Sequence, residues 1–332
     1  MLSYVIAFFS LLSLFSCGLA VAPSGSSGNL AVEEIPIEPS PDASDPKRFG
    51  SLTFLSGFEL RSSDRRFGGL SGLVLSPDGS QLHAVSDRGY WVSILVRHDA
   101  QGRLISLGAM EIFPLLTPEG SEVKGRERDA EALVWDRDGS LIVSFEQVHR
   151  LWRYPPPPDA FHSLPQPIPT PAELASAPSN GGLEAMTVLP DERILAITET
   201  YKNPDGSLKG WLIEKDQFIS LSYLPFEEFR PTDLAALSNG DVLLLESRFG
   251  LLSGWAARIV RIPRESLLPG ARLIGEEIAH IEPPLVVDNF EGMAVREDPQ
   301  AGTLIYLVSD DNYSPFQRTL LLQFRLGTTR GN

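Results

Sequence analysis

The chain has almost no cysteine and little positive charge. Its one cysteine, Cys17, lies in an apolar N-terminal stretch, so the remainder of the chain has neither a disulfide nor thiol chemistry. Only 28 Lys and Arg residues oppose 43 Asp and Glu residues, and the formal net charge is −15. A surface of this sign repels phosphate backbones and anionic lipid. We therefore expect no nucleic-acid partner and no membrane contact beyond an N-terminal anchor.

Long helical periodicity and the common nucleotide or nucleophile motifs are also missing. With 28 Gly and 27 Pro residues, the chain favours many short strands joined by turns. No P-loop or dinucleotide fingerprint is found. The run Gly69-Leu70-Ser71-Gly72 stops one residue short of the G-x-S-x-G motif. The five histidines are scattered, which argues against zinc.

The first 22 residues carry no charged side chain and predict an export signal. Ala20-Val21-Ala22 is a cleavage site of the A-x-A type, so residues 1–22 are expected to be removed. Two alternatives stay open. Leu14-Phe15-Ser16-Cys17 resembles a lipobox, which would make Cys17 a lipid anchor, and an uncleaved Leu2–Ala22 helix is long enough to span a membrane. All three predict a periplasmic or secreted domain.

The segment 23–50 differs in composition from the rest of the chain. It is rich in Pro, Ser, Gly and acidic residues and has too few apolar side chains to form a core, so we expect a disordered linker. Residues 51–327 form the predicted folded domain, which we expect to be a monomer.

A two-strand pattern recurs five times along this domain, with starts separated by about 49 to 60 residues. Each copy has a short apolar strand, a turn that contains Gly or Asp in most copies, and a second apolar strand, which is typical of a β-hairpin. Each copy also contains further strands. The first hairpin strands begin at Leu70, Ala130, Leu183, Thr232 and Phe290.

A sheet unit repeated at this period predicts an all-β fold, a β-propeller of five four-stranded blades. The last unit lacks a fourth strand, and Leu52–Leu60 could supply it and close the ring. A sixth blade is an alternative if residues around Arg103–Leu116 hide a degenerate copy. The proline-rich stretch Pro155–Pro178 is expected to be an exposed loop.

Acidic residues recur at both ends of the predicted hairpins. Nine of ten such positions are acidic, whereas Asp and Glu make up 43 of 332 residues overall. The positions at the start of strand one are Ser71, Glu131, Glu184, Asp233 and Glu291, and those at the end of strand two are Asp87, Glu146, Glu199, Glu246 and Asp310.

In an antiparallel hairpin these two ends lie opposite each other. Glu131 is therefore expected beside Glu146, and the other pairs obey the same rule. At ~6 Å and an effective dielectric constant of ~20, one such pair costs roughly 3 kcal/mol. A bound cation, an Arg or Lys, or a shared proton must offset this cost. All-oxygen ligands favour Ca²⁺, and the nine acids are the candidate ligands. The alternative is that they cap backbone amides or pair with nearby arginines.

The motifs in this chain, taken together, resemble the phytase-like family, described by the phrase "esterase-like activity of phytase". The resemblance covers about residues 52–326. The segments that carry it are Gly68–Leu73, Ser86–Gly89, Asp129–Leu133, Asn289–Met293 and Ser309–Thr319.

The resemblance implies an exported propeller with phosphoesterase or esterase activity on a small molecule. In the metal-assisted form of this hypothesis, Ca²⁺ neutralises the substrate and activates a water molecule. Arg88 and Arg248 would bind a phosphate, and Glu131 or Glu291 would be the general base. The alternatives are a calcium-dependent lactonase or carboxylesterase, and a propeller that only binds partners.

Overall fold

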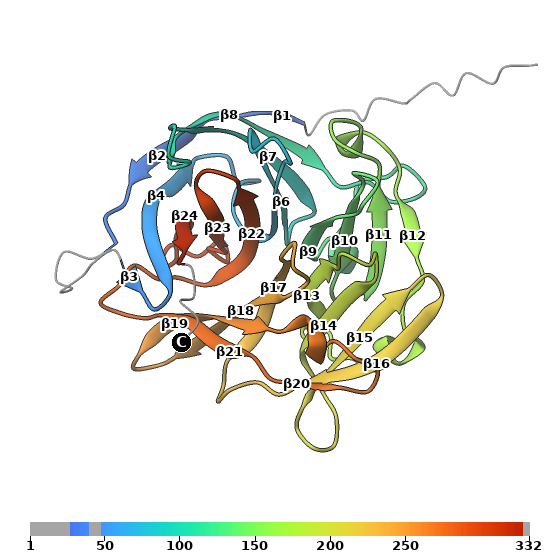
Figure 1. Ribbon diagram of the computed structural model, residues 1–332. Helices are drawn as coiled ribbons and strands as arrows, with labels where there is room; N and C mark the ends of the chain where they lie inside the picture. Colours follow the sequence, from blue (N-terminus) through green and yellow to red (C-terminus); the bar gives the residue numbers. More distant parts are fainter. Residues whose placement is uncertain (1–26, 40–47, 328–332) are drawn as a thin grey trace, which may run out of the picture.

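The computed structural model describes residues 27–39 and 48–327. Five sheets surround a common centre, with β9, β13, β17 and β22 toward the inside and β8, β12, β16 and β4 toward the periphery (Figure 1). The predicted five-bladed propeller is confirmed. The predicted signal segment 1–22, including Cys17, lies outside the described residues.

Each blade is a sheet whose strands follow one another outward from the channel. Blade 1 contains β5 (Leu70–Leu75), β6 (Gln81–Ser86), β7 (Tyr90–His98), β8 (Leu104–Pro114) and the outer β1 (Gly28–Leu30). Blade 2 contains β9 (Ala130–Trp135), β10 (Leu141–Phe145), β11 (Arg150–Tyr154) and β12 (Gln166–Ile168). Blade 3 contains β13 (Leu183–Val188), β14 (Ile194–Lys202), β15 (Leu208–Glu214), β16 (Gln217–Tyr223) and the short parallel β20 (Arg272–Leu273).

The remaining strands form two more blades. Blade 4 contains β17 (Arg230–Ala236), β18 (Val242–Gly250), β19 (Gly254–Ile262) and β21 (Glu276–Ile281). Blade 5 contains β22 (Phe290–Asp298), β23 (Gly302–Ser309), β24 (Thr319–Leu326), β4 (Leu52–Ser62), β2 (Val32–Pro36) and β3 (Arg48–Phe49). The helical turns are η1 (Gly125–Glu127), η2 (Asp159–Phe161), η3 (Ala172–Ser176) and η4 (Arg264–Ser266).

The innermost strands form a closed ring in which β5, β9, β13, β17 and β22 each contact the next, and β22 contacts β5. Five strands around one axis leave little room, so small residues are needed where they meet. A Cβ added to Gly72 would lie 2.3 Å from the Leu133 nitrogen, and one added to Gly292 would lie 2.1 Å from the Ser71 carbonyl oxygen. These two glycines therefore allow β5 to approach both of its neighbours.

The predicted closure of the ring by an N-terminal strand is confirmed. β4 pairs antiparallel with β24, with Leu60 opposite Thr319 and Leu52 opposite Leu326. The predicted disordered linker is wrong for part of segment 23–50. Within it, β2 pairs with β4, β1 pairs with β8, and β3 pairs with β4. Backbone hydrogen bonds to exposed sheet edges hold these strands, and composition alone does not reveal an edge of this kind.

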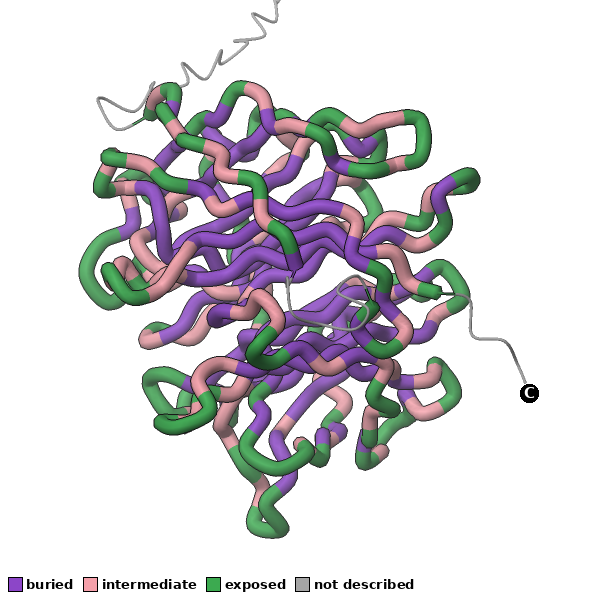
Figure 2. The backbone as a smooth tube through the Cα atoms, turned by 90° about the vertical axis from the view of Figure 1, so that its left-hand side faces the viewer, coloured by how far each residue is buried: buried purple, intermediate pink, exposed green. Residues whose placement is uncertain are grey.

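Two other expectations need correction. The stretch Pro155–Pro178 is more than an exposed loop, because β12 is the fourth strand of blade 2 and Phe161 and Leu174 are buried. The residues around Arg103–Leu116 form β8, the fourth strand of blade 1, so they are not a sixth blade. Figure 2 shows buried strand segments through the middle of the molecule and exposed loops around it. In the described ranges, no helix is long and apolar enough to cross a membrane.

Candidate functional site

The first hairpin of every blade contains a register shift near the start of its first strand, where four of the five blades carry an acid and blade 1 carries Ser71. In blade 3, Leu183 and Ala185 pair with the consecutive residues Thr198 and Ile197, which leaves Glu184 as the extra residue. Glu291 has the same place in blade 5. A bulge redirects side chains at the rim of a sheet. Glu184 and Glu291 therefore have no direct cross-strand partner, but three of the predicted neighbour pairs still lie close together, because Glu146 acts electrostatically on Glu131, Glu199 on Glu184 and Glu291 on Asp310.

Acids from four blades meet at this end of the channel. Glu131 experiences the charges of Asp87, Glu146 and Glu291, and Glu184 those of Glu199, Glu146, Glu131 and Glu291. Asp310 experiences those of Asp87 and Glu291. We call this set the acidic mouth; its members are Asp87, Glu131, Glu146, Glu184, Glu199, Glu291 and Asp310.

Burial and repulsion by neighbouring acids raise the pKa of six carboxyl groups of the acidic mouth: Asp87, Glu131, Glu146, Glu184, Glu291 and Asp310. Burial, with the charges of neighbouring acids, raises the pKa of Asp87 to about 7, that of Glu291 to about 8 and that of Asp310 to about 9. The same two causes raise the pKa of Glu131 and Glu184 well above the ordinary range. Burial raises the pKa of Glu146 to about 7, although the amides of Gly181 and Gly182 donate to its carboxylate. The acidic mouth therefore holds protons at neutral pH.

Two predicted ligands have other partners. Asp233 is buried and accepts hydrogen bonds from the amides of Leu234 (2.8 Å) and Met293 (2.7 Å), which ties blade 4 to blade 5. Glu246 is opposite Pro231 rather than beside Asp233. Its carboxylate is fully buried.

The side chain of Glu246 lies between blade 4 and blade 3, because its partners Arg258 and Tyr223 belong to β19 and β16. It pairs with Arg258 (Nε to Oε2, 3.1 Å) and accepts a hydrogen bond from the Tyr223 hydroxyl (2.8 Å). Burial still raises the pKa of Glu246 to about 7. The alternative of amide capping and arginine pairing thus describes Asp233 and Glu246, and it also applies to Glu146, which accepts hydrogen bonds from two amides, and to Glu199, which pairs with Arg230.

In blade 1, Ser71 occupies the position at the start of the first strand where the other blades carry an acid. The Ser71 hydroxyl donates to the Asp87 carboxylate over 3.0 Å. Asp129 was not among the residues predicted from the sequence. Its carboxylate accepts a hydrogen bond from Gln147 (2.6 Å) and acts electrostatically on Asp87 and Glu131. Its position directly before a first strand was the available signal.

The largest cleft beside the acidic mouth has a volume of about 840 Å³. Glu199 and Glu291 line one part of it, together with Arg230 and Arg248. The Asn289 side chain donates to Oε1 of Glu291 at 2.5 Å, and Arg230 pairs with Glu199 at 3.0 Å. The cleft therefore combines a protonatable carboxyl group that is held in place with two guanidinium groups.

A smaller cavity of about 390 Å³ is lined by Asp87, Arg88, Asp129 and Tyr313, among others. The Arg88 guanidinium stacks over the Tyr313 ring at 3.3 Å and donates to the Arg65 carbonyl oxygen. Arg88 and Arg248 therefore line different cavities, so the structure does not bring together the two arginines that we predicted would bind one phosphate.

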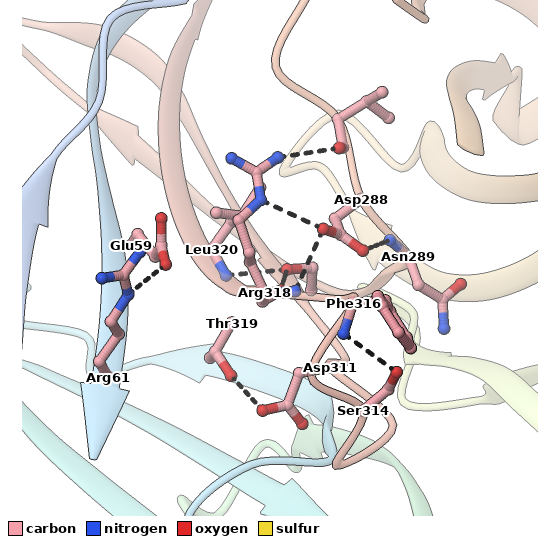
Figure 3. Close-up of polar contacts among 12 residues, drawn as sticks. Glu59, Arg61, Asp288, Asn289, Asp311, Ser314, Phe316, Arg318, Thr319 and Leu320 are labelled. Atoms are coloured by element: carbon pink, nitrogen blue, oxygen red, sulfur yellow. Dashed lines mark hydrogen bonds and ion pairs between the residues drawn. The ribbon is translucent and has the colours of Figure 1, made fainter. Parts of the chain in front are cut away.

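The connection between β23 and β24 separates these cavities, because Asn312 lines the larger one and Tyr313 the smaller one. Figure 3 shows how its ends are held. Asp288 pairs with Arg318 (3.5 Å), and the Thr319 hydroxyl donates to the Asp311 carboxylate (3.1 Å). Asp311 also accepts a hydrogen bond from the Gly69 amide of blade 1 (2.9 Å), so this connection also bridges the closure of the ring.

The donor chemistry of the acidic mouth suits a hard cation, because carboxylate oxygens are the ligands that Ca²⁺ prefers. A cation would also relieve the repulsion that raises the pKa of Glu291 and its neighbours. The positions of these carboxylates relative to one another are less favourable for binding a metal ion. Over residues 27–39 and 48–327, no group of three or more acidic, His or Cys side chains is arranged to hold a metal ion. The donors fit Ca²⁺ in type, and their arrangement is not a finished metal site.

Solved structures with detectable likeness cover most of the chain. One is provisionally described as a gluconolactonase, with 13% identity over 93% of this chain and 95% of its own and a TM-score of 0.43. Another is the PQQ-bound aldose sugar dehydrogenase from Streptomyces coelicolor, with 15% identity, 85% and 100% coverage and a TM-score of 0.45. A third is virginiamycin B lyase from Staphylococcus aureus, with 11% identity, 88% and 80% coverage and a TM-score of 0.40. Likeness at this level says nothing about substrate or chemistry.

No curated protein matches the chain. The family model described as "Phytase-like: Esterase-like activity of phytase" matches residues 65–313. That range contains the five first hairpins, all seven acids of the acidic mouth and both cavities beside it. This chain therefore belongs to the phytase-like family.

Proposed function

We propose that this protein is an exported hydrolase of small-molecule esters or phosphoesters that acts in the cleft at the acidic mouth. The observation that carries the proposal is Glu291. This carboxyl group lines a cleft of about 840 Å³ and is oriented by Asn289. Burial and neighbouring acids raise its pKa to about 8. A perturbed carboxyl group in a cleft is a candidate acid–base catalyst.

Glu291 would act as the general base. Its ionised carboxylate takes a proton from a water molecule, and the water oxygen forms a bond to the carbonyl carbon or phosphorus of the substrate. The ester C–O or P–O bond then breaks, and the leaving oxygen receives the proton. A base of this kind contributes about 10²–10⁴-fold to the rate.

Arg230 and Arg248 would stabilise the charge that develops on the substrate oxygens. Both line the cleft, and each is held by a carboxylate: Arg230 by Glu199 at 3.0 Å and Arg248 by Glu227 at 2.7 Å. Donors that are fixed before the reaction stabilise a developing oxyanion without reorganising. Arg88 and Glu131, the other predicted catalytic residues, do not line this cleft.

In this proposal, Ca²⁺ binds to carboxylates of the acidic mouth. Glu131, Glu184, Glu291 and Asp310 are the acids that would gain most from a cation, because burial and repulsion raise the pKa of each. When bound, the ion would supply positive charge at the mouth and favour the ionised form of Glu291. The proton transfer described above uses only side chains of the chain itself.

The test is turnover of p-nitrophenyl acetate, a simple lactone and p-nitrophenyl phosphate by the purified protein, with Ca²⁺ and with EDTA. We expect kcat to rise with pH through about 8, because the base must lose its proton. In Glu291→Gln, kcat should fall by about 10²–10⁴-fold. Glu265→Gln, which removes an acid that lines a separate pocket and not the cleft, is the matched control.

Two results would contradict the proposal. Turnover that is unchanged in Glu291→Gln would remove this residue as the base. Absence of turnover of all three substrates under both metal conditions would favour a propeller that only binds partners. Export is tested separately: N-terminal sequencing of the protein from the extracellular or periplasmic fraction should begin at Pro23, and a block at Cys17 would indicate lipidation.

A further inference from the structure

One wall of the large cleft is apolar and belongs to a hairpin that extends beyond blade 4. β18 and β19 remain paired to their ends, with Phe249 opposite Trp255 and Gly250 opposite Gly254. The Phe249 and Trp255 rings lie 5.0 Å apart, and both residues line the cleft. Phe249 nevertheless stays 56% exposed. We call this pair the aromatic wall.

Exposure of the aromatic wall has a cost. Apolar surface left in water forfeits about 25 cal/mol per Å², and exposed aromatic side chains within a cleft are typical of a surface that binds an apolar group. At the tip of the same hairpin, Leu251 and Leu252 are 91% and 102% exposed. Glu291 lines the same cleft as the aromatic wall, so one bound molecule could contact both.

The charges in the cleft do not favour a polyanion. Four carboxylates and three cationic groups line it: Glu199, Glu227, Glu228, Glu291, Lys202, Arg230 and Arg248. Two of the three cations are already paired, Arg230 with Glu199 and Arg248 with Glu227. The whole chain carries a formal charge of −15. A phosphate dianion would therefore compete with carboxylates that are already in place.

We propose that the cleft takes a neutral carboxylic ester or lactone whose alkyl or aryl group packs on the aromatic wall, in preference to a polyanionic phosphoester. This inference rests on the proposed hydrolase function and narrows its substrate class. The polar ester group lies toward Glu291 and Arg230, and the apolar group packs against the cleft-facing side of the aromatic wall. An apolar contact of this kind discriminates substrates by length, methylene by methylene.

The test is a series of p-nitrophenyl esters from acetate to octanoate, with p-nitrophenyl phosphate and phytate alongside. The leaving group is constant within the ester series, so only the acyl chain varies. We expect kcat/KM to rise about threefold per methylene for the first few methylenes. In Trp255→Ala, the ratio of kcat/KM for the octanoate ester to kcat/KM for the acetate ester should fall about tenfold. Phe249→Leu is a milder second variant in case Trp255→Ala fails to fold.

The matched control is Leu268→Ala, which removes an apolar side chain that is also more than half exposed but does not line the cleft. The octanoate-to-acetate ratio of kcat/KM should not change in Leu268→Ala. A flat ester series, or phosphate or phytate turnover above that of every ester, would overturn the substrate class while leaving the hydrolase proposal in place.

A binding experiment separates the two proposals. We expect 2-nonanone, a neutral ketone that cannot be hydrolysed, to bind the wild-type protein in a calorimetric titration and to bind Trp255→Ala at least tenfold more weakly. Ketone binding through the aromatic wall without turnover of any ester would defeat the hydrolase proposal alone. Absence of ketone binding in a protein that hydrolyses esters would defeat the aromatic-wall inference alone.

Discussion

The two ends of the channel carry the same type of residue in opposite electrostatic states. At the acidic mouth, burial and repulsion raise the pKa of Glu291 to about 8. At the other end, which we call the turn mouth, the hairpin turns surround a cavity of about 660 Å³ lined by residues such as Pro77, Arg137, Pro190, Ser238 and Glu297. There the hydroxyls and amides of a turn lower the pKa of Asp78 to about 2.

The partners of each carboxylate explain the difference. At the turn mouth, Asp241 accepts hydrogen bonds from Arg261, Asn239 and the amide of Arg264. At the acidic mouth, bulges direct carboxylates toward one another across a narrow channel. Between the ends, buried side chains of the innermost strands, such as Leu73 and Leu133, line a narrower cavity of about 160 Å³. The carboxylates of the turn mouth stabilise the fold, whereas those of the acidic mouth lower its stability and suit a functional site.

The largest expected effect is on the pH dependence of stability. Acids at the acidic mouth have folded-state pKa values of about 7 to 9, above their ordinary values near 4. The folded protein then holds more protons than the unfolded chain, so its stability falls as pH rises from about 4 to 9. Calorimetry without divalent ions should show the melting temperature falling by on the order of 10 °C between pH 5 and pH 9.

In that experiment, the triple substitution Glu131→Gln, Glu184→Gln and Glu291→Gln should flatten the slope. A melting temperature that rises over the same range would show that the mouth carboxylates are ionised and compensated.

The second prediction concerns Ca²⁺. At pH 8, a Ca²⁺ concentration about 100-fold above the dissociation constant should stabilise the fold by about 2.7 kcal/mol, which is a rise of roughly 5–10 °C. EDTA should reverse it. The rise should disappear in the triple variant and persist in Asp191→Asn, a change at the turn mouth. No shift in the wild-type protein would remove the cation from the proposed function.

The third prediction tests the turn mouth. Asp241→Ala removes the acceptor of hydrogen bonds from Arg261 and Arg264 in a buried position. It should cost about 2 kcal/mol, measured by urea denaturation at pH 7, and should leave the Ca²⁺ response unchanged. A stabilised variant would mean that Asp241 is as strained as the mouth acids.

The smallest effect is expected at an exposed turn. Asp78 accepts hydrogen bonds from Ser76 and Ser80, which lower its pKa to about 2. The stability that the ionised Asp78 carboxylate provides is present above about pH 4 and is lost as pH falls toward 2. Asp78→Asn should therefore change the melting temperature by only about 1 °C at pH 7 and still less at pH 2. A larger loss at pH 2 than at pH 7 would contradict the assigned ionisation.

Much of the fold could be predicted because the hairpin repeat is local. Strand periodicity and turn residues indicated all five first hairpins and the closing strand at Leu52. Edge strands such as β1, β2 and β12 were missed, because they are short, carry proline or acids and depend on a partner far along the chain. Seven of the nine predicted acids meet at the acidic mouth, whereas Asp233 and Glu246 are held by other partners.

The sequence by itself determined which residues recur, and therefore that carboxylates would gather at one end of a five-unit ring. Only the tertiary structure decided how each one is used. A one-residue bulge turns Glu184 and Glu291 into the channel, whereas Arg258 and Tyr223 hold Glu246 between blades 4 and 3. Register, burial and distant partners set these outcomes, because the charge state of a carboxyl group depends on what surrounds it in space and not on its neighbours in the chain.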